Sequence, residues 1–431
     1  MKIGFISLGC SKNLVDTEMM IGLLEKGKIE ITNKPEEAEM IIINTCGFIE
    51  SAKQEAINTI LEMVEYKNTG VCKYLVVTGC LVERYKKELE ESLPEVDLFI
   101  PINEYDKFSE KIGKLIQIKL SEYQLEYIDR HITTGADTAY LKIAEGCSNR
   151  CTYCAIPYIR GPFISRPMEE ILKEAEKLNN KGIKEIIVIA QDTTKYGIDI
   201  YGESKLAELL EKLSKFENFK WIRFLYAYPE SVTDELIDVV KNNPKICKYF
   251  DIPIQHISDK ILKTMNRAST SEQIEKLVSK IRKEIPEAIL RTSLIVGFPG
   301  ETEEQFEELY KFVEKTKFNK LGVFEYSKED GTPAEKLKNQ IPKKVKAERW
   351  KKIMALQNRI SENILKQYIG KEYDVLVEKV TDKYIIGRTK MDVPEMDGQI
   401  YLKNTKPVKI GDFVKGIVTS VEEYDLIGRI K

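Results

Sequence analysis

Three cysteines lie close together near the middle of the chain, at Cys147, Cys151 and Cys154. Their spacing, Cys-x-x-x-Cys-x-x-Cys, lets one short loop present three thiolates, which can bind three irons of a cubane iron–sulfur cluster. The fourth iron then has no protein ligand and is open to another molecule. Structural zinc sites usually have four protein ligands in two pairs, so the triplet fits zinc poorly. The spacing therefore predicts a 4Fe-4S site, with a zinc knuckle or three buried thiols as alternatives.

Three more cysteines, Cys10, Cys46 and Cys80, each end an apolar run that is followed by a helical pattern. Alternating apolar strands and helices predict a parallel sheet, whose strands all end at the edge where ligands bind. These thiols are therefore expected to converge on a second site, and an adjacent glycine lets backbone amides approach each sulfur. Ordinary core cysteines are the alternative. Cys72 and Cys247 have no such pattern and are expected to be bystanders.

The elements that must position these cysteines divide the chain into parts, and the expected fold class is α/β. Residues 1–115 are expected to form the parallel α/β domain, and 116–137 a polar linker. Six strand–helix repeats within 138–369 predict a partial barrel, with the cysteine loop after its first strand at the mouth where such folds do chemistry. Residues 370–431 alternate like strands of a small antiparallel barrel, OB-like in style.

Composition limits the function classes. The 431 residues are 42% hydrophobic and 32% charged, and 67 Lys+Arg nearly balance 69 Asp+Glu, so no global electrostatic footprint for nucleic acid exists. No signal peptide opens the sequence and no apolar run is long enough for a membrane span. We therefore expect a cytoplasmic monomer without membrane contact, whose eight cysteines serve metal binding or catalysis rather than disulfides.

The motifs around these cysteines resemble the radical S-adenosylmethionine (SAM) methylthiotransferase family over nearly the whole chain. The stretches LGCSKNLVDTE, NTCGFIESAKQEAI and VTGCLVERY carry the resemblance, together with GCSNRCTYC and LRTSLIVGFPGETEEQF. The resemblance implies three parts: an N-terminal three-cysteine domain, a radical SAM partial barrel and a C-terminal TRAM domain. The tRNA-modifying MiaB branch has Gln-Met-Asn after its first cysteine. Here Ser11-Lys12-Asn13 stands there, which resembles the RimO branch.

The resemblance implies a reaction with two 4Fe-4S clusters and SAM. One cluster, on Cys147, Cys151 and Cys154, would cleave SAM to a 5′-deoxyadenosyl radical that removes a hydrogen from the β-carbon of an aspartate. The second, on the N-terminal cysteines, would carry a sulfur species that another SAM methylates. The substrate in this branch is protein twelve of the small ribosomal subunit, and a flavodoxin or ferredoxin would donate electrons. Facing open irons would place both reagents beside one substrate carbon.

Family position also suggests residues that bind SAM, and they lie in the barrel segment: Tyr153, Gln191, Arg223, Ile295, Val296 and Gly297. Tyr153 is expected near the adenine, with simple packing as the alternative. Gln191 is expected near the SAM amino group, although a turn or cap role is open. Arg223 lies in an apolar strand, where a buried arginine needs an anionic partner: the SAM carboxylate or a structural ion pair. His256 is expected to be structural.

Two other functions stay open from the sequence. One is a tRNA methylthiotransferase acting on a modified adenosine. The other is a non-enzymatic iron–sulfur or zinc protein that binds RNA through the terminal barrel. In residues 371–431 nine Lys and two Arg face six Asp and five Glu, whereas an RNA-reading barrel is usually more basic. The acidic cluster Asp392, Glu395 and Asp397 is instead expected to dock a basic ribosomal protein, with a solvated turn as the alternative.

Overall fold

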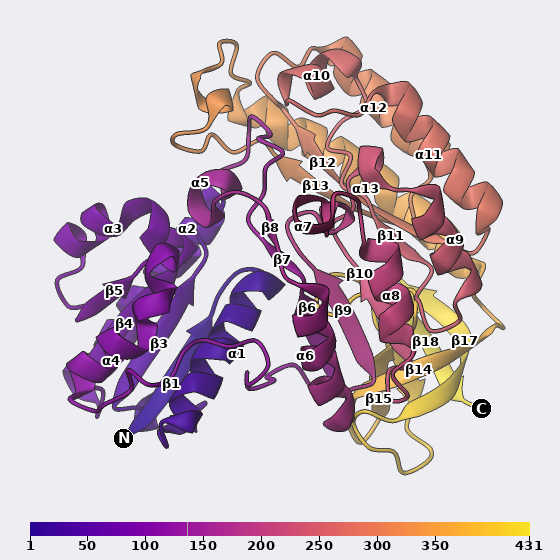
Figure 1. Cartoon of the computed structure of the whole chain (residues 1–431). Helices are drawn as coiled ribbons and strands as arrows, with labels where there is room; N and C mark the ends of the chain where they lie inside the picture. Colours follow the sequence, from indigo (N-terminus) through magenta and orange to yellow (C-terminus); the bar gives the residue numbers. More distant parts are fainter. Residues whose placement is uncertain (136) are drawn as a thin grey trace.

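The computed structural model describes residues 1–135 and 137–431, so one position of the linker expected at 116–137 lies outside the described residues. The chain forms an N-terminal α/β domain, a central partial barrel and a small C-terminal barrel (Figure 1). The central barrel lies between the other two, so it shares an interface with each of them.

The N-terminal domain is a five-stranded, all-parallel sheet in the order β2-β1-β3-β4-β5. Its elements are β1 (Lys2–Ser7), α1 (Ser11–Lys26), β2 (Glu30–Thr32), β3 (Met40–Thr45), α2 (Glu50–Thr69), β4 (Tyr74–Gly79), α3 (Cys80–Ser92), β5 (Leu98–Ile100) and α4 (Phe108–Ile116). The sequence predicts only three of these strands. The other two, β2 and β5, are edge strands of three residues each, too short to show a hydrophobic period.

The segment between α4 and the barrel is irregular, as expected of a linker, but it is not a free tether. Arg130 is buried there and pairs with Glu18 of α1 and with Glu174 of the barrel domain. The backbone amide of His131 also donates to the Glu18 carbonyl at 3.0 Å. The segment therefore fastens the two domains together, because a buried guanidinium must keep both carboxylates beside it.

The central domain carries the six predicted barrel strands in two hydrogen-bonded groups, β6-β9-β10 and β11-β12-β13. Within each group the strands pair in parallel, and an isolated parallel bridge from Ile222 to Ile246 spans the gap. The strands are β6 (Thr138–Lys142), β7 (Ala144–Glu145), β8 (Ile164–Ser165), β9 (Glu185–Ile189), β10 (Trp221–Phe224), β11 (Tyr249–Asp251), β12 (Ile289–Val296) and β13 (Lys320–Glu325). The helices are α5 (Ile156–Arg160), α6 (Met168–Asn180), α7 (Ile198–Tyr201), α8 (Leu206–Ser214), α9 (Asp234–Asn242), α10 (Asp259–Thr264), α11 (Ser271–Glu284), α12 (Glu303–Thr316) and α13 (Lys343–Lys366).

Both faces of these strands are buried, which explains their continuous apolar sequence. Ile186 and Val188 face outward and pack under the surrounding helices. Ile187 faces inward, into a core that also takes Val15 from α1 and Val393 from the C-terminal domain. The other two domains thus fill the inside of the partial barrel, so their docking is part of its folding.

The C-terminal domain is a closed barrel in the order β14-β15-β16-β18-β17. Its strands are β14 (Glu372–Val380), β15 (Tyr384–Arg388), β16 (Ile400–Lys403), β17 (Phe413–Glu422) and β18 (Asp425–Ile430). The expected antiparallel pairing holds for four pairs, whereas β16 and β18 pair in parallel to close the barrel. The chain turns back between β17 and β18, where Glu423 adopts a φ of 45°.

The acidic cluster in this domain does not form the expected docking patch. Asp392 is buried and pairs with Lys320 at 2.6 Å. The side chain of Asp397 is 2% exposed and accepts a hydrogen bond from the Tyr249 hydroxyl at 2.6 Å. Only Glu395 is exposed. The prediction was wrong for two of the three residues because their carboxylates are occupied by Lys320 and Tyr249, which are distant in sequence.

Among the described residues no helix has the length and apolar character that crossing a membrane requires.

Candidate active site

The first cysteine group stands at one edge of the N-terminal sheet. Cys10 caps the start of α1 after β1, Cys46 follows β3, and Cys80 begins α3 directly after β4. Because β1, β3 and β4 are adjacent and parallel, the three loops lie side by side at their carboxyl ends. We call these residues the N-terminal trio. Cys10 also stands at the start of α1, where the backbone amides of Lys12 and Asn13 point at its sulfur and favour a thiolate.

Two residues fit the loops of this trio together. Gly9 has a φ of 88°, and a Cβ at this position would lie 2.7 Å from the Cβ and 3.0 Å from the Sγ of Cys46. A side chain there would displace the thiol. Asn13 donates to the carbonyls of Leu8 and Thr45 at 3.1 and 3.0 Å, and the Cys80 thiol donates to its Oδ1 at 3.4 Å. The asparagine therefore ties the first and second loops to the third.

Positive charge surrounds the N-terminal trio. Arg160, on α5, donates to Cys80 Sγ at 3.6 Å and to Asp16 at 2.9 Å. Burial raises the pKa of the Cys10 thiol, but Lys12, Arg160 and backbone amides outweigh it, so the pKa lies below its ordinary value. Burial raises the pKa of Cys80 to about 12 although Arg160 opposes it. An iron ligand at these positions would replace the thiol proton, since only thiolates ligate.

The second cysteine group, the loop trio of Cys147, Cys151 and Cys154, lies between β7 and α5 at the barrel mouth. Its loop is fixed from several sides. The Cys147 amide donates to the Gly161 carbonyl at 3.1 Å, and Thr152 donates through its amide to Met265 at 3.0 Å. A loop held by such bonds presents its thiols in a set geometry, which cluster assembly needs.

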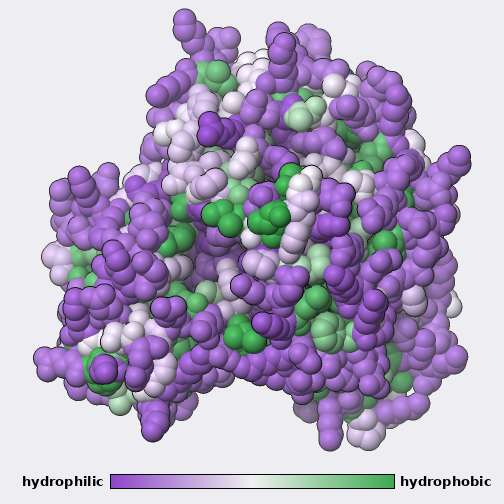
Figure 2. Space-filling model, viewed as in Figure 1, coloured by the Kyte–Doolittle hydropathy of each residue, from purple (hydrophilic) through white to green (hydrophobic). Residues whose placement is uncertain are grey.

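The two trios are neighbours on either side of α5. Cys80 packs against Ala155 and Ile159, and Ala155 directly follows Cys154. Figure 1 shows α5 between the N-terminal domain and the barrel strands, and Figure 2 shows the surface hollowed between these two domains. Both trios therefore border the same gap rather than opposite surfaces of the molecule.

The donor sets suit cubane clusters better than single ions. No group of three or more His, Cys, Asp or Glu side chains in residues 1–135 and 137–431 converges closely enough to ligate one metal ion. A cubane does not require such convergence, because each thiolate binds a different iron. Three thiols in each trio, with backbone amides directed at Cys10, Cys46, Cys147 and Cys154, provide three ligands and the hydrogen bonds that tune a cluster.

The residues expected to bind SAM lie in different places. Tyr153 and Ile295 pack in one apolar cluster beside the loop trio, and Gly297, with a φ of 70°, directly follows the end of β12. Gln191 donates to Glu145 Oε1 at 2.9 Å, and its own Oε1 is buried without a partner. The side chain of Val296, by contrast, packs into the outer core, because neighbours on a strand face opposite sides.

Arg223 takes the structural alternative that the sequence left open. Its guanidinium is fully buried and bonds to Glu185 at 3.2 Å and to the Lys390 carbonyl at 2.9 Å. Arg388 of the C-terminal domain pairs with the other oxygen of Glu185 at 2.6 Å. The arginine therefore anchors two domains at the inside of the barrel. His256 is likewise buried, with Nδ1 accepting from the Ser258 amide at 3.0 Å.

Sequence reasoning missed the charged residues between the trios. Arg160 donates to both oxygens of Glu145, at 3.1 and 3.0 Å, as well as to Asp16. Lys142 bridges the same two carboxylates at 2.5 and 2.8 Å. An arginine six residues after the last loop cysteine, within IPYIRG, was the available signal. Its partners could not be identified locally, because Asp16 is 144 positions away.

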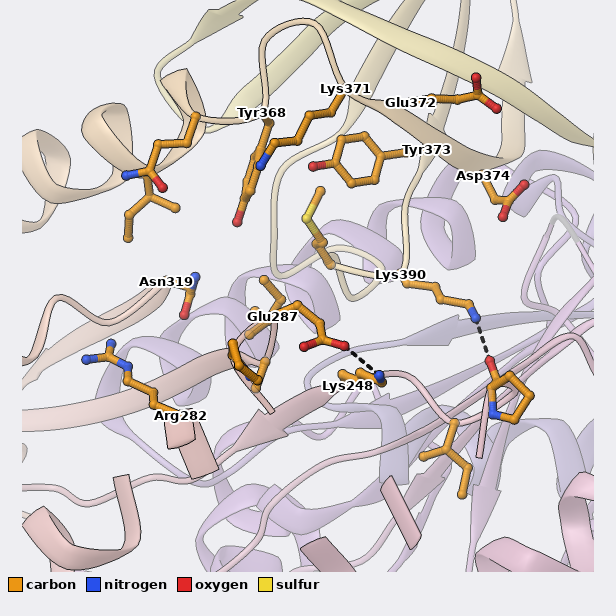
Figure 3. Close-up of a pocket in the computed structure, with 18 of the residues that line it drawn as sticks. Lys248, Arg282, Glu287, Asn319, Tyr368, Lys371, Glu372, Tyr373, Asp374 and Lys390 are labelled. Carbon is orange, nitrogen blue, oxygen red and sulfur yellow. Dashed lines mark hydrogen bonds and ion pairs between the residues drawn. The ribbon is translucent and has the colours of Figure 1, made fainter. Parts of the chain in front are cut away.

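A cavity of about 900 Å³ lies elsewhere, among the starts of β11 and β12, the end of α13 and the C-terminal domain (Figure 3). Tyr368, Lys371 and Lys390 border it, and Lys248 there pairs with Glu287 at 2.5 Å. No cysteine lines this cavity. Its size therefore does not make it the candidate reaction site, since neither cysteine trio lines it.

Three family models match the chain. The radical SAM superfamily matches residues 141–313, Uncharacterized protein family UPF0004 matches 2–101, and the TRAM domain matches 369–430. Each match falls on one of the three domains described above.

Curated relatives cover the whole chain. A protein of Alkaliphilus oremlandii is 61% identical over 100% of this chain and 99% of its own length. Proteins of Acetivibrio thermocellus and Clostridium botulinum are 51% and 53% identical, over 100% and 99% of this chain and 98% and 97% of their own lengths. All three are named ribosomal protein uS12 methylthiotransferase RimO.

Solved structures share the fold. The radical SAM methyltransferase TsrM from Kitasatospora setae, with tryptophan and a SAM analogue bound, has a TM-score of 0.58 at 12% identity. That match covers 83% of this chain and 89% of the TsrM chain. The cobalamin-dependent enzyme OxsB has a TM-score of 0.52 at 15% identity, over 82% of this chain and 56% of OxsB. At such identities the likeness shows the fold alone.

Proposed function

This chain belongs to the RimO family of radical SAM methylthiotransferases, and we propose that it adds a methylthio group to the β-carbon of an aspartate in ribosomal protein uS12. The relatives' shared name, at 51–61% identity over full length, supports this assignment. The relatives' name does not favour the alternative of a tRNA methylthiotransferase. The sequence difference at Ser11-Lys12-Asn13 agrees with it.

The single observation that carries the proposal is the position of the two trios on either side of α5. The loop trio would hold one 4Fe-4S cluster with SAM, and the N-terminal trio a second with the sulfur donor. When bound, these groups supply one-electron chemistry and transferable sulfur, which amino-acid side chains lack. A substrate in the shared gap would meet both.

The chain itself supplies position and charge. Asn13 and Gly9 hold the three N-terminal loops at close approach. Arg160 links that trio to Glu145 at the barrel mouth, which also receives a hydrogen bond from Gln191. Side chains fixed by packing and buried ion pairs lose little freedom when substrate arrives, so the reacting groups keep their alignment.

We also propose the finer points of the setting. The chain acts as a cytoplasmic monomer and takes electrons from a flavodoxin or ferredoxin. The overall charge is nearly balanced, and Asp392 and Asp397 of the C-terminal acidic cluster are already paired inside the protein. Substrate capture is therefore left to the gap beside the trios rather than to that cluster. Size-exclusion chromatography and reduction assays with each donor would test these points.

The decisive experiment counts clusters and identifies the product. After anaerobic reconstitution we expect about eight irons and eight sulfides per wild-type chain, as two cubanes require. Two variants, C10A/C46A/C80A and C147A/C151A/C154A, should each keep half of this content and form no methylthio product. C72S and C247S remove thiols that lie outside both trios and serve as matched controls.

Mass spectrometry would then separate the substrates. A uS12 peptide should gain a methylthio group while tRNA digests stay unchanged. One cubane in the wild-type protein, or product from the C10A/C46A/C80A variant, would overturn the proposal. Modified tRNA with an unmodified peptide would reassign the substrate.

A further inference from the structure

Lys12 is a buried cation whose only role so far is to lower the pKa of the Cys10 thiol. It stands two residues after Cys10, on the first turn of α1, and only 6% of it is exposed. Its Nζ lies 3.2 Å from the centre of the Tyr226 ring, which belongs to the barrel domain. The side chain therefore crosses the gap between the two domains beside the N-terminal trio.

The ammonium lacks a carboxylate. Within residues 1–135 and 137–431, no Asp or Glu oxygen forms an ion pair with Lys12, whose charge acts on the Cys10 thiol and whose Nζ contacts the ring of Tyr226. The neighbouring buried cations differ, since Lys142 pairs with two carboxylates and so does Arg160. A cation–π contact offsets only part of the desolvation of an ammonium. Since no carboxylate of the described residues pairs with Lys12, its ammonium can accept a carboxylate from outside the chain.

Tyr226 is held in place for this contact. Its φ is 63°, a left-handed conformation that is uncommon for an aromatic residue and is retained where the surroundings enforce it. Its amide donates to Asp251 Oδ2 at 3.0 Å, and its carbonyl accepts from the Thr193 amide at 3.1 Å. The tyrosine follows β10 at the carboxyl end of the barrel, so Lys12 lies at the mouth, where substrate must enter.

We propose that Lys12 binds the side-chain carboxylate of the substrate aspartate and so determines specificity for an acidic residue. This inference rests on the proposed function and deepens it. A carboxylate accepts charge-assisted hydrogen bonds from an ammonium, whereas an amide offers no negative charge. The carboxylate carbon is bonded directly to the β-carbon, so holding the acid group places the reacting carbon beside both trios. Lys12 is a binding residue in this scheme and exchanges no proton.

The test compares two peptides and three variants. A uS12 peptide and its Asp→Asn counterpart would be titrated against anaerobically reconstituted wild-type, K12M, K12R and K26M proteins, with iron content and product measured in parallel. K12M removes the charge and keeps an unbranched side chain. K26M is the matched control, because Lys26 lies at the far end of the same helix and pairs with Glu126 and Asp129.

Wild-type protein and K26M should bind the Asp peptide about 10- to 100-fold more tightly than the Asn peptide, as expected for one hydrogen bond between charged groups. K12M should lose this ratio with little change in affinity for the Asn peptide, and K12R should keep part of it. Equal weakening of both peptides by K12M, or an unchanged ratio, would overturn the inference.

The two levels of the proposal fail differently. If wild-type protein methylthiolates the Asp peptide and K12M keeps the Asp/Asn ratio, only the role of Lys12 is wrong. If wild-type protein with both clusters modifies no uS12 peptide, the proposed function itself fails. If K12M loses iron, the ratio of Asp-peptide to Asn-peptide affinity in K12R tests the role of Lys12 instead, because K12R keeps the positive charge.

Discussion

The central barrel meets its two neighbouring domains through buried charges, but the two interfaces are built differently. Beside α5, three cations, Lys12, Lys142 and Arg160, stand with two carboxylates, Asp16 and Glu145. Around Glu185, toward the C-terminal domain, two arginines face two carboxylates, and every member is paired. The group beside α5 has one more cation than carboxylate and adjoins the N-terminal trio, whereas the group around Glu185 is balanced.

The difference separates anchoring from chemistry. Burying an ion pair costs desolvation free energy, and when both charges belong to the chain the pair fixes the orientation of the two domains. A buried charge without a counter-charge can still be stabilised by a ligand of opposite charge, which adds to the binding free energy of that ligand. A buried charged residue therefore does not by itself indicate a ligand-binding site in this molecule. A buried charged residue that lacks a carboxylate partner does. Arg223 belongs to the first kind and Lys12 to the second.

The largest effect on stability should come from the complete interface. Replacing Glu185 by Gln leaves Arg223 and Arg388 buried without their shared carboxylate, so the free energy of unfolding should fall by about 3–5 kcal/mol. Urea denaturation of the reconstituted protein measures it. E378Q is the control, since Glu378 pairs with Arg388 from a side chain that is 21% exposed, and it should cost below about 1 kcal/mol. Equal losses would show that burial does not distinguish the two pairs.

A smaller loss of stability, with a larger loss of activity, is expected at the incomplete interface. In R160Q, Asp16 and Glu145 still have Lys142, so unfolding should become easier by about 1–3 kcal/mol. Methylthio product should fall on the order of 100-fold, because α5 would no longer be held to the N-terminal trio. R160K should recover part of it. Full activity in R160Q would contradict the positioning role.

A third prediction uses pH. Burial and the charge of Arg349 lower the pKa of His256 to about 3, so the folded chain does not bind the proton that an unfolded histidine binds near pH 6.5. Stability contributed by neutral His256 is present above pH 6.5 and is lost as pH falls toward 3. Between pH 6 and 5 the free energy of unfolding should fall by up to about 1.4 kcal/mol per unit from this group.

The variant H256N keeps an acceptor for the Ser258 amide and removes the titrating ring. Its unfolding free energy should depend on pH less steeply than that of wild-type protein over the same interval, as urea denaturation at pH 5, 5.5 and 6 would reveal. The chain has one other histidine, His131, which is exposed, so the difference between the two proteins isolates His256. Parallel pH profiles would refute the neutral, buried state.

The smallest effect should appear at the 900 Å³ cavity beside the C-terminal domain. Lys415 pairs there with Asp374 at 2.8 Å, and both side chains are about half exposed. K415Q should therefore change the free energy of unfolding by less than about 1 kcal/mol and leave the methylthio product yield at the wild-type level. A large fall in product yield would mean that this cavity takes part in substrate capture, and the contrast between the interfaces would need revision.

Much of the site could be predicted because its chemistry is local in sequence. Cys10, Cys46 and Cys80 were expected at strand ends, and each follows a strand of the parallel sheet. The six barrel strands were likewise recognised from their apolar runs. The short edge strands were not predicted, because a strand of three residues is too short to show a hydrophobic period. The parallel pairing of β16 with β18 was not predicted either, because the sequence of neither strand indicates which strand it pairs with to close the barrel.

The charged residues are the part that local pattern could not place. Arg223 and Asp392 looked available for ligands from sequence, and both proved to be paired inside the protein. The sequence suggested no role for Arg160 or Lys12, although Arg160 contacts Cys80 and Lys12 contacts Tyr226 of the barrel domain. A charged side chain can reach many partners, and only the folded chain decides which partner is within reach.

The amino-acid sequence by itself determined which thiols are present, their spacing and the strand ends that carry them, since hydrophobic period and cysteine spacing act over a few residues. Tertiary structure alone decided that α5 separates the two trios, that Glu185 is shared by two arginines, and that Lys12 has no carboxylate. Those relations join residues far apart in sequence, such as Glu185 and Arg388, which are 203 positions apart, and contacts of that range exist only after the domains have packed.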